Sequence, residues 1–460
     1  MNYKTKIISL VYMPCLLSLI FTFDPTISFF IAWFGSFYIF YITIFSSLAP
    51  LRTSKNGTVP VMKPIILIQI IFAGFMCCTS IFYFLEHSDG EVNLISYCQR
   101  LSLLAHSSMV SGMILTIRSE KKVNKVTFNP SLNLILSICL ISYLSAKSLN
   151  YLAPLIQFKY PLQVLSITSA VYLFVKAAAA KHFIHILVGL SIFGIHFIES
   201  TLTGFKEGVI VQILTLAFVA FHYYRKVVLI TTFPILLFSL YVLPTYTTIM
   251  RAESWKNGKS MSSARLQAYE TFFNDESEYL IIENNWMFLT NRFSEIGMFV
   301  KYIKHTPDHR DFIGLEILGN VLDSLIPRFL WVNKPITEDV AMRRVYDAGV
   351  ANRSSEVSAK TRPVVDGYLI AGATGVFLVM LGYGMITQII SNTAEKLFGG
   401  YELGGILIFN SLFQQLWRGN TFEFLINNVI YGFLLMLIIY AMMNVMNVFS
   451  VITQNENNTN

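Results

Sequence analysis

Charged residues are scarce in this sequence. Only 13% of its 460 residues are charged, whereas 54% are apolar, and the mean hydropathy is +0.56. A soluble domain of this length cannot bury that much apolar surface, so lipid must cover part of it. The shortage of charge therefore excludes an ordinary soluble enzyme and indicates a membrane protein.

Cysteine is rare, and the common nucleotide-binding motifs are absent. The five cysteines all fall inside apolar runs, which predicts no disulfide framework. The sequence has no G-x-x-x-x-G-K-[ST] loop for ATP, no G-x-S-x-G nucleophile elbow and no D-x-D motif for a metal-bound nucleotide sugar. We therefore expect no cofactor and no metal, and any reaction must use an already activated substrate.

Long apolar runs are what the sequence does contain. Many reach the length of about 18 residues that a hydrocarbon core requires, and a chain inside lipid must satisfy its own backbone hydrogen bonds as a helix. We therefore predict an all-α polytopic membrane protein with about 12 transmembrane helices. The predicted helices span residues 7–23, 28–49, 63–85, 94–116, 132–153, 160–176, 183–199, 208–223, 227–247, 366–389, 402–417 and 424–448.

The distribution of Lys and Arg predicts the orientation. The loops on one side carry most of these residues, whereas those on the other carry only Lys159, Lys206 and Arg418. The rich side should be cytoplasmic, so the net charge of +7 needs no nucleic-acid partner. Twelve crossings then place both termini in the cytoplasm. The predicted division is 1–250 for helices one to nine, 251–365 for an outer loop, 366–450 for the last three helices and 451–460 for a disordered tail.

The long outer loop has helical patterns of its own. Residues 312–326 place Ile313, Ile317, Val321 and Leu325 at helical spacing, which predicts an amphipathic helix that lies on the membrane or on the helix bundle. Residues 278–303 also read as helical. We therefore expect a small folded cap and not a flexible linker.

Several ionisable side chains fall where lipid makes them costly. Glu86, Arg100, Lys147 and Glu199 all lie in the outer part of their predicted helices. Further arginines follow in the outer loops, at positions Arg292, Arg328, Arg362 and Arg418. Two interpretations stay open: a basic pocket that binds a phosphate-bearing lipid, or long side chains that snorkel to the interface.

Three segments carry a family resemblance. Residues 326–335 (IPRFLWVNKP) resemble the PR-x-L-W-x-x-K-P signature of bacterial oligosaccharide repeat-unit polymerases, the Wzy group. Residues 366–375 (DGYLIAGATG) resemble their E-x-Y-x-N-F-G-x-x-G segment, with Asp366 where Glu is usual and Ile370-Ala371 where Asn-Phe is usual. Residues 203–207 (TGFKE) resemble their G-x-[RK] segment.

The resemblance implies a GT-C-like, metal-independent glycosyltransferase of the bacterial inner membrane. Such proteins make O-antigen or capsule by transferring a growing glycan from undecaprenyl pyrophosphate to a new lipid-linked repeat unit at the periplasmic face. The implied partners are lipid-linked oligosaccharides and the bilayer, and a chain-length regulator is a further partner that the sequence leaves open.

This reaction needs cations at the leaving group and a base at the acceptor hydroxyl. We predict that Arg328 and Asp366 are catalytic. The predicted pyrophosphate ligands are Arg292, Arg328, Lys206, Arg418 and Arg362. Further candidates are Glu283 and Asp311 as alternative bases, together with Arg100, Lys334 and Tyr368.

Two of these residues have an equally open structural interpretation. Asp366 is either the base or the ion-pair partner of a nearby arginine. Lys334 either touches phosphate or orders the turn from Trp331 to Pro335.

Two alternative functions remain. An O-antigen ligase would pass the glycan to the lipid A core and would be expected to use a histidine near its arginines, for which His305 and His309 are available. A lipid-linked oligosaccharide flippase would show two similar halves, and the sequence has no such internal symmetry.

Overall fold

The structure is a computed structural model that describes residues 3–452 apart from several gaps. The gaps are residues 51–62, 118–124, 129, 153–154, 156–157, 203–205, 254–259, 273–276, 328–329, 332, 352–360, 399–420 and 448. The chain forms two compact units, one made of Met1–Asn129 with Phe293–Asn460 and the other of Pro130–Arg292. Each unit is helical, and each is described separately below.

The first unit combines both ends of the chain. Its helices are α1 (Tyr3–Ile20), α2 (Pro25–Phe40), α3 (Pro64–Ala73), α4 (Ser80–Thr116), α12 (Ile296–His305), α13 (Glu316–Leu325), α14 (Thr337–Asp347), α15 (Pro363–Phe398) and α18 (Phe422–Val445), with π-helical turns Tyr41–Phe45 and Gly74–Cys78. Local signals set several boundaries. For example, α2 begins with Asp24 as its N-cap and Pro25 in its first turn.

The centre of this unit is the contact between α4 and α15. A Cβ atom at Gly112 would overlap the backbone at Leu381, and one at Gly384 would overlap the backbone at Met109. The two glycines therefore allow the helix backbones to touch, which is the usual means of close packing between membrane helices.

Glu91 marks the boundary between two of the predicted helices. The apolar stretch Pro64–Thr116 has 53 residues, which corresponds to about 80 Å of helix, more than twice the hydrocarbon thickness. The backbone leaves helical geometry at Glu91 (φ −133°, ψ 16°). The predicted helices 63–85 and 94–116 are thus both present, but they join through this kink and not through a loop.

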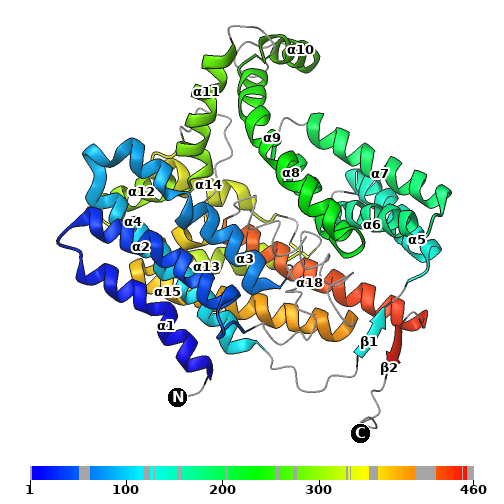
Figure 1. Cartoon of the computed structure of the whole chain (residues 1–460), viewed down its shortest axis with the longest axis horizontal. Coiled ribbons are helices and arrows are strands. Elements are labelled where there is room, and N and C mark those ends of the chain that lie inside the picture. Colours follow the sequence, from blue (N-terminus) through cyan, green and yellow to red (C-terminus); the bar gives the residue numbers. More distant parts are fainter. Residues whose placement is uncertain are drawn as a thin grey trace. The chain divides into compact units, whose positions relative to one another are not determined.

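Several chain segments that we predicted to be cytoplasmic lie together at one end of this unit. The Nζ of Lys4 donates to the carbonyl of Ile117 at 2.8 Å, and Lys63 pairs with Glu395 at 3.8 Å. Strand β1 (Lys125–Phe128) pairs antiparallel with β2 (Phe449–Ile452), and the two lie side by side near the C-terminus (Figure 1). These contacts agree with a shared side for these segments, while the membrane face that they occupy stays a prediction.

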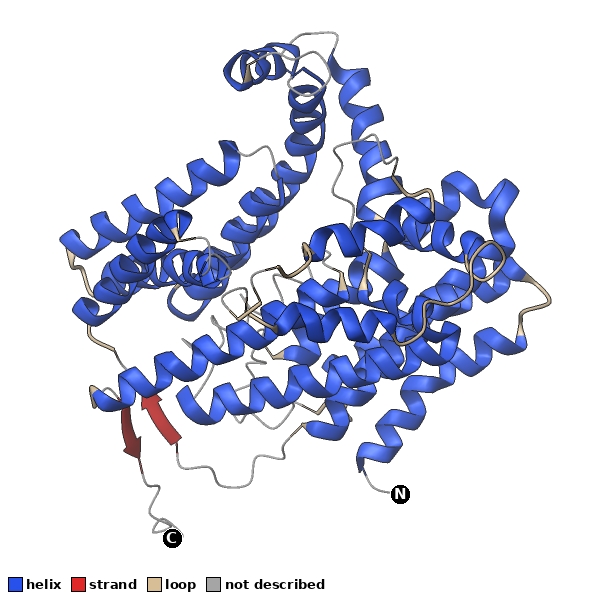
Figure 2. Ribbon diagram, turned by 180° about the vertical axis from the view of Figure 1, so that it is seen from behind, coloured by secondary structure: helices blue, strands red, loops and turns tan. Residues whose placement is uncertain are grey.

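The described residues are helical, as predicted, apart from one short pair of strands near the C-terminus (Figure 2). Strand β2 includes Val451 and Ile452, the first two residues of the predicted tail, and the rest of that tail lies outside the described residues. Val and Phe residues in both four-residue segments favour the extended conformation that this pairing uses.

The second unit contains the remaining helices. They are α5 (Leu132–Ser148), α6 (Lys159–Ala179), α7 (Phe183–Leu202), α8 (Lys206–Tyr223), α9 (Arg225–Arg251), α10 (Met261–Phe272) and α11 (Ser277–Phe288), with a 3-10 turn Leu149–Tyr151 and a π-helical turn Leu289–Phe293. Met250 of α9 packs on Ala264 and Ala268 of α10, a helix that the sequence pattern did not predict.

Nine stretches of the described residues are long and apolar enough to cross a membrane, so the architecture is that of an α-helical, multi-pass membrane protein. Helix α8 contains a shorter apolar stretch, Gly208–Phe221, and the predicted helix 402–417 lies outside the described residues. Within the predicted outer loop, the helix expected over 278–303 is divided into α11, the π-helical turn and α12. The amphipathic helix is present as α13, and α14 was not predicted.

Candidate functional site

A buried group of three ionisable side chains lies where α14 meets the first turns of α15 and α18. Arg344 donates from both terminal nitrogens to Glu423, at 2.6 and 2.8 Å, and its Nη2 lies 3.3 Å from Oδ1 of Asp366. Both carboxylates are fully buried, and Arg344 is 6% exposed. We call this group the Arg344 triad.

Hydrogen bonds from two neighbours complete the triad. The hydroxyl of Thr361 donates to Asp366 Oδ1 at 2.8 Å, and the backbone N–H of Phe422 donates to Asp366 Oδ2 at 2.8 Å. Asp366 thus joins the beginning of α15 to the beginning of α18, while Arg344 ties α14 to both helices. The triad fixes the cap helix α14 on the membrane-spanning part of the unit.

The electrostatics of the triad favour a charged Arg344. Burial alone would lower the pKa of Arg344, but the carboxylates of Asp366 and Glu423 outweigh this effect and raise it above its usual value. Burial also raises the pKa of the nearby Tyr302, and the charge of Asp366 raises it further. Among the described residues, the Tyr302 hydroxyl has no hydrogen-bond partner.

A polar cavity of about 220 Å³ opens beside the triad. Its lining comes from the segment before α13 and from α13 and α14, and consists of Arg310, Ile313, Glu316, Asn320, Val340, Arg343, Arg344 and Asp347. We call it the arginine cavity. Arg310 forms an ion pair with Asp347. Arg343 and Glu316 are exposed, and no other residue that the structure describes forms an ion pair with either of them.

The arginine cavity therefore combines a cation and a carboxylate that are not neutralised by described neighbours. A guanidinium such as Arg343 binds phosphate oxygens in a bidentate manner. A carboxylate such as Glu316 accepts a proton from a hydroxyl that it reaches. This is the pair of chemical groups that glycosyl transfer from a lipid pyrophosphate requires.

The predicted site residues do not gather in one place. Asp366 belongs to the triad, which matches its interpretation as an ion-pair partner of an arginine. Arg362, predicted as a pyrophosphate ligand, forms an ion pair with Glu295. Tyr368 is buried and donates its hydroxyl hydrogen to the carbonyl of Thr306 at 2.9 Å. Each of these side chains already has a protein partner.

Lys334 and Arg100 also have protein partners. Lys334 is buried, and its Nζ donates to the carbonyls of Ser324 (2.7 Å) and Ile326 (2.8 Å), so it holds the end of α13 and not only the turn from Trp331 to Pro335 that we predicted it to order. Arg100 is half-buried and donates to the hydroxyls of Ser28 (2.9 Å) and Ser96 (3.0 Å). Arg100 is thus hydrogen-bonded to neutral groups in a helix where a charge is costly.

The other candidates divide between the two units or lie outside the described residues. Asp311 is exposed in the first unit, whereas Arg292 and Glu283 are exposed in the second. Lys206 is the first residue of α8, in the second unit, and its side chain is not among the described ones. Arg328 and Arg418 lie outside the described residues, so the roles predicted for them stay predictions.

Two of the charges that we predicted to lie near the outer face pair with each other. Lys147 of α5 forms an ion pair with Glu199 of α7, and His196 of the same helix hydrogen-bonds the Ser166 hydroxyl at 3.0 Å. Lys147 is therefore part of an ion pair inside the second unit. This contact accounts for its charge without the phosphate-binding pocket that the sequence suggested.

Sequence reasoning missed the residues that matter most in this site. Glu423 lies in the first turn of an apolar helix. An ionisable side chain in such a helix is costly in lipid, which is the reason that Glu199 was singled out, and the same criterion applies to Glu423. Arg343 and Arg344 lie in residues 337–347 (TEDVAMRRVYD), where Ala341 and Val345 are buried at i, i+4 spacing. That spacing is a helix signal which was available in the sequence.

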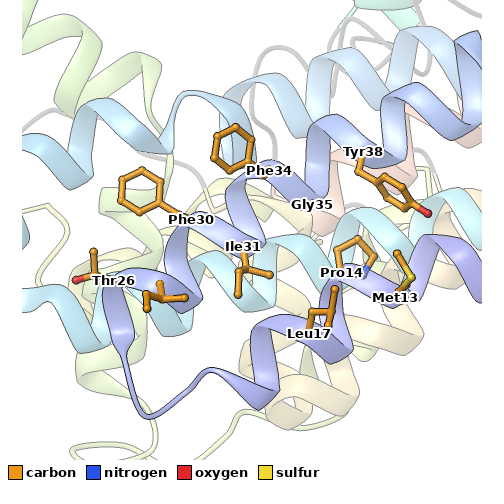
Figure 3. Close-up of a pocket in the computed structure, with 10 residues that line it drawn as sticks. Met13, Pro14, Leu17, Thr26, Phe30, Ile31, Phe34, Gly35 and Tyr38 are labelled. Carbon is orange, nitrogen blue, oxygen red and sulfur yellow. The ribbon is translucent and has the colours of Figure 1, made fainter.

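A separate apolar groove of about 440 Å³ runs between α1 and α2. Met13, Pro14 and Leu17 line it from α1, and Ile31 extends toward them from α2 (Figure 3). The residues that line the groove are uncharged and mostly apolar, so its surface suits hydrocarbon.

Comparison with known proteins gives a family without an assigned activity. Residues 13–451 match the family described as Domain of unknown function (DUF8712). No curated protein matches the chain, and no solved structure does.

Proposed function

We propose that this chain, which belongs to the DUF8712 family, is a membrane glycosyltransferase that polymerises lipid-linked oligosaccharides. A growing glycan on undecaprenyl pyrophosphate is transferred to a new lipid-linked repeat unit at the periplasmic face of the bacterial inner membrane. The GT-C-like arrangement of twelve crossings, with both termini in the cytoplasm, is part of this proposal.

The arginine cavity is the observation that carries the proposal. It lies among the cap elements between α12 and α15, within the region that the Wzy-like signature marks in the sequence. The pyrophosphate leaving group gains concentrated negative charge as its bond to the sugar breaks, and a preorganised guanidinium stabilises that charge. Arg343 is the cation that we assign to this role, with Arg310 beside it.

The reaction needs one base and no redox partner. The acceptor hydroxyl oxygen forms a bond to the anomeric carbon of the growing glycan, and the bond from that carbon to the pyrophosphate oxygen breaks. The hydroxyl proton passes to a carboxylate, for which we assign Glu316, because Asp347 pairs with Arg310 and Asp366 is held in the triad. Asp366 then acts by positioning α14, and Arg328 keeps its sequence-based assignment at the pyrophosphate.

Surface polysaccharide from a deletion strain tests the proposal. Loss of a polymerase leaves single repeat units on lipid A, so the ladder on a gel collapses to one short band. Complementation with Arg343→Ala or Glu316→Gln should reduce polymer by about 100-fold or more, as expected for loss of a transition-state contact or a base. Lys301→Ala, an exposed change on α12, is the matched control and should restore the ladder. A full ladder from both cavity variants would refute the assignment of the site.

An O-antigen ligase is the second candidate, and one observation favours it. His305 and His309 stack with their ring centroids 5.8 Å apart, and the next residue, Arg310, lines the arginine cavity. Loss of a ligase leaves long chains on undecaprenyl pyrophosphate and none on lipid A. Accumulation of such chains in the deletion strain, together with a strong defect in His305→Ala or His309→Ala, would favour the ligase over the polymerase.

A further inference from the structure

Helix α13 belongs to the predicted outer loop, yet it packs along the membrane-spanning helix α18. The hydroxyl of Tyr431 donates to the carbonyl of Leu325 at 3.1 Å, and the side-chain amide of Asn427 donates to the carbonyl of Ser324 at 2.7 Å. Tyr431 follows the first residue of α18, Phe422, by nine positions, which corresponds to about 14 Å of helix. The hydroxyl of Ser324 also donates to the carbonyl of Glu423 at 3.3 Å, so the C-terminal end of α13 lies along α18 from its first turn to about two turns further on.

The C-terminal end of α13 has its backbone satisfied by side chains. The last turn of a helix leaves carbonyls without intrahelical partners, and at a surface water satisfies them. Here Lys334 donates to the carbonyls of Ser324 and Ile326, while α18 supplies the donors for Ser324 and Leu325. Lys334 is only 8% exposed. Lipid offers no hydrogen bonds, so a helix end at membrane depth must have its carbonyls satisfied by protein donors, as they are here.

Helix α13 has three faces. Ile317 and Val321 are buried on the side that packs in the unit. Glu316 and Asn320 line the arginine cavity. On a third face, residues at i, i+3 and i+7 spacing are exposed: Leu315 is 74% exposed, Leu318 38% and Leu322 66%. A water-exposed cap helix needs only one apolar face, and α13 has two.

We propose that α13 is a re-entrant helix that dips into the outer leaflet along α18, with its leucine face (Leu315, Leu318 and Leu322) in contact with lipid acyl chains. Lipid is the occupant that both observations support, since the leucine face lies beside a membrane-spanning helix and the helix end is capped without water. The proposal holds whether or not the chain polymerises glycans. It also places the arginine cavity, on the neighbouring face of α13, at the membrane surface where a lipid headgroup lies.

Spin labels on the full-length protein in liposomes of phosphatidylethanolamine and phosphatidylglycerol test the depth. Leu322→Cys is labelled, and its collisions with oxygen, which partitions into lipid, are compared with collisions with a water-soluble nickel chelate. Ile438→Cys on α18, where the native side chain is 55% exposed, is the lipid reference, and Lys301→Cys on α12 is the water reference. The parent protein, whose five native cysteines are buried or half-buried, gives the background.

We expect the label at position 322 to behave as the label at position 438 does, with oxygen access several-fold above chelate access. A label that behaves like that at position 301 would place the leucine face in water and overturn the proposal. A label shielded from both reagents would mean that a protein covers this face, which would also overturn it.

A second pair of variants tests the capping of α13 independently of labelling. Lys334→Met keeps the length of the side chain but removes the donors, so the freed carbonyls should draw α13 out of the leaflet and reduce the oxygen access of the 322 label by several-fold. Lys301→Met is the matched control and should leave the signal unchanged. An unaltered signal in folded Lys334→Met would show that the helix end does not depend on this cap, and would contradict the re-entrant placement.

Discussion

Removing the charge of Arg344 should destabilise the protein more than any exposed substitution in the cap. Arg344→Met leaves Glu423 and Asp366, both 0% exposed, without their shared cation. Breaking a buried ion pair by removing one partner costs about 3–5 kcal/mol, because the remaining charge stays buried without compensation. Two carboxylates lose their cation here, so the upper part of this range applies.

Unfolding of the detergent-solubilised protein, followed by intrinsic fluorescence, measures this loss. The neighbouring Arg343→Met is the matched control, since Arg343 is exposed and should cost less than about 0.5 kcal/mol. Adding Glu423→Gln to Arg344→Met should recover part of the loss, because a neutral amide has no charge to leave uncompensated. If Arg344→Met cost less than about 1 kcal/mol, or if Glu423→Gln made it worse, the triad would not hold the cap as we argue.

Two further predictions concern the packing of the first unit. Gly384→Ala should lower the free energy of unfolding by about 1–3 kcal/mol, because its Cβ would overlap the carbonyl of Met109. Gly382→Ala, at a position where space is open, should be nearly neutral in the same unfolding measurement. Equal effects of the two variants would refute the close contact between the helices. The variant with Val126→Cys and Val451→Cys should form a disulfide on oxidation, since these residues are Cα partners in the antiparallel pair. Disulfide formation is followed by the mobility shift on non-reducing gels, with a variant that carries Val126→Cys and Met446→Cys for comparison. If the disulfide formed more slowly in the Val126→Cys and Val451→Cys variant than in this one, the register would be contradicted.

The membrane helices were predictable because their signal is local. An apolar run of sufficient length must become a helix in lipid, so most predicted ranges correspond to helices within a few residues at each end. An apolar run does not determine where a helix bends or breaks, and the exceptions are of this kind. The kink at Glu91 and the break at Ala371–Gly372 inside α15, where Gly372 has a φ of 59°, interrupt stretches that are helical on both sides.

The candidate site was harder to predict because its members are far apart in the chain. Arg344 and Glu423 are separated by 79 positions, and nothing in either local sequence names the other. The possibility that Asp366 pairs with an arginine was foreseen, but the arginine itself was not. Helix α14 was missed because its few apolar residues, such as Ala341 and Val345, gave a weak signal beside many charged ones.

The arginines of the cap can be ranked by how far protein carboxylates already neutralise them. Arg344 has two carboxylates, Arg362 has Glu295 and Arg310 has Asp347. A guanidinium that is neutralised in this way stabilises added negative charge less, since part of its field is already balanced. Of the three arginines that line the arginine cavity, Arg343 alone pairs with no carboxylate among the described residues, so it is the one of these three best suited to a phosphate. Its substitution should therefore remove activity while stability stays, whereas substitution of Arg344 should remove both.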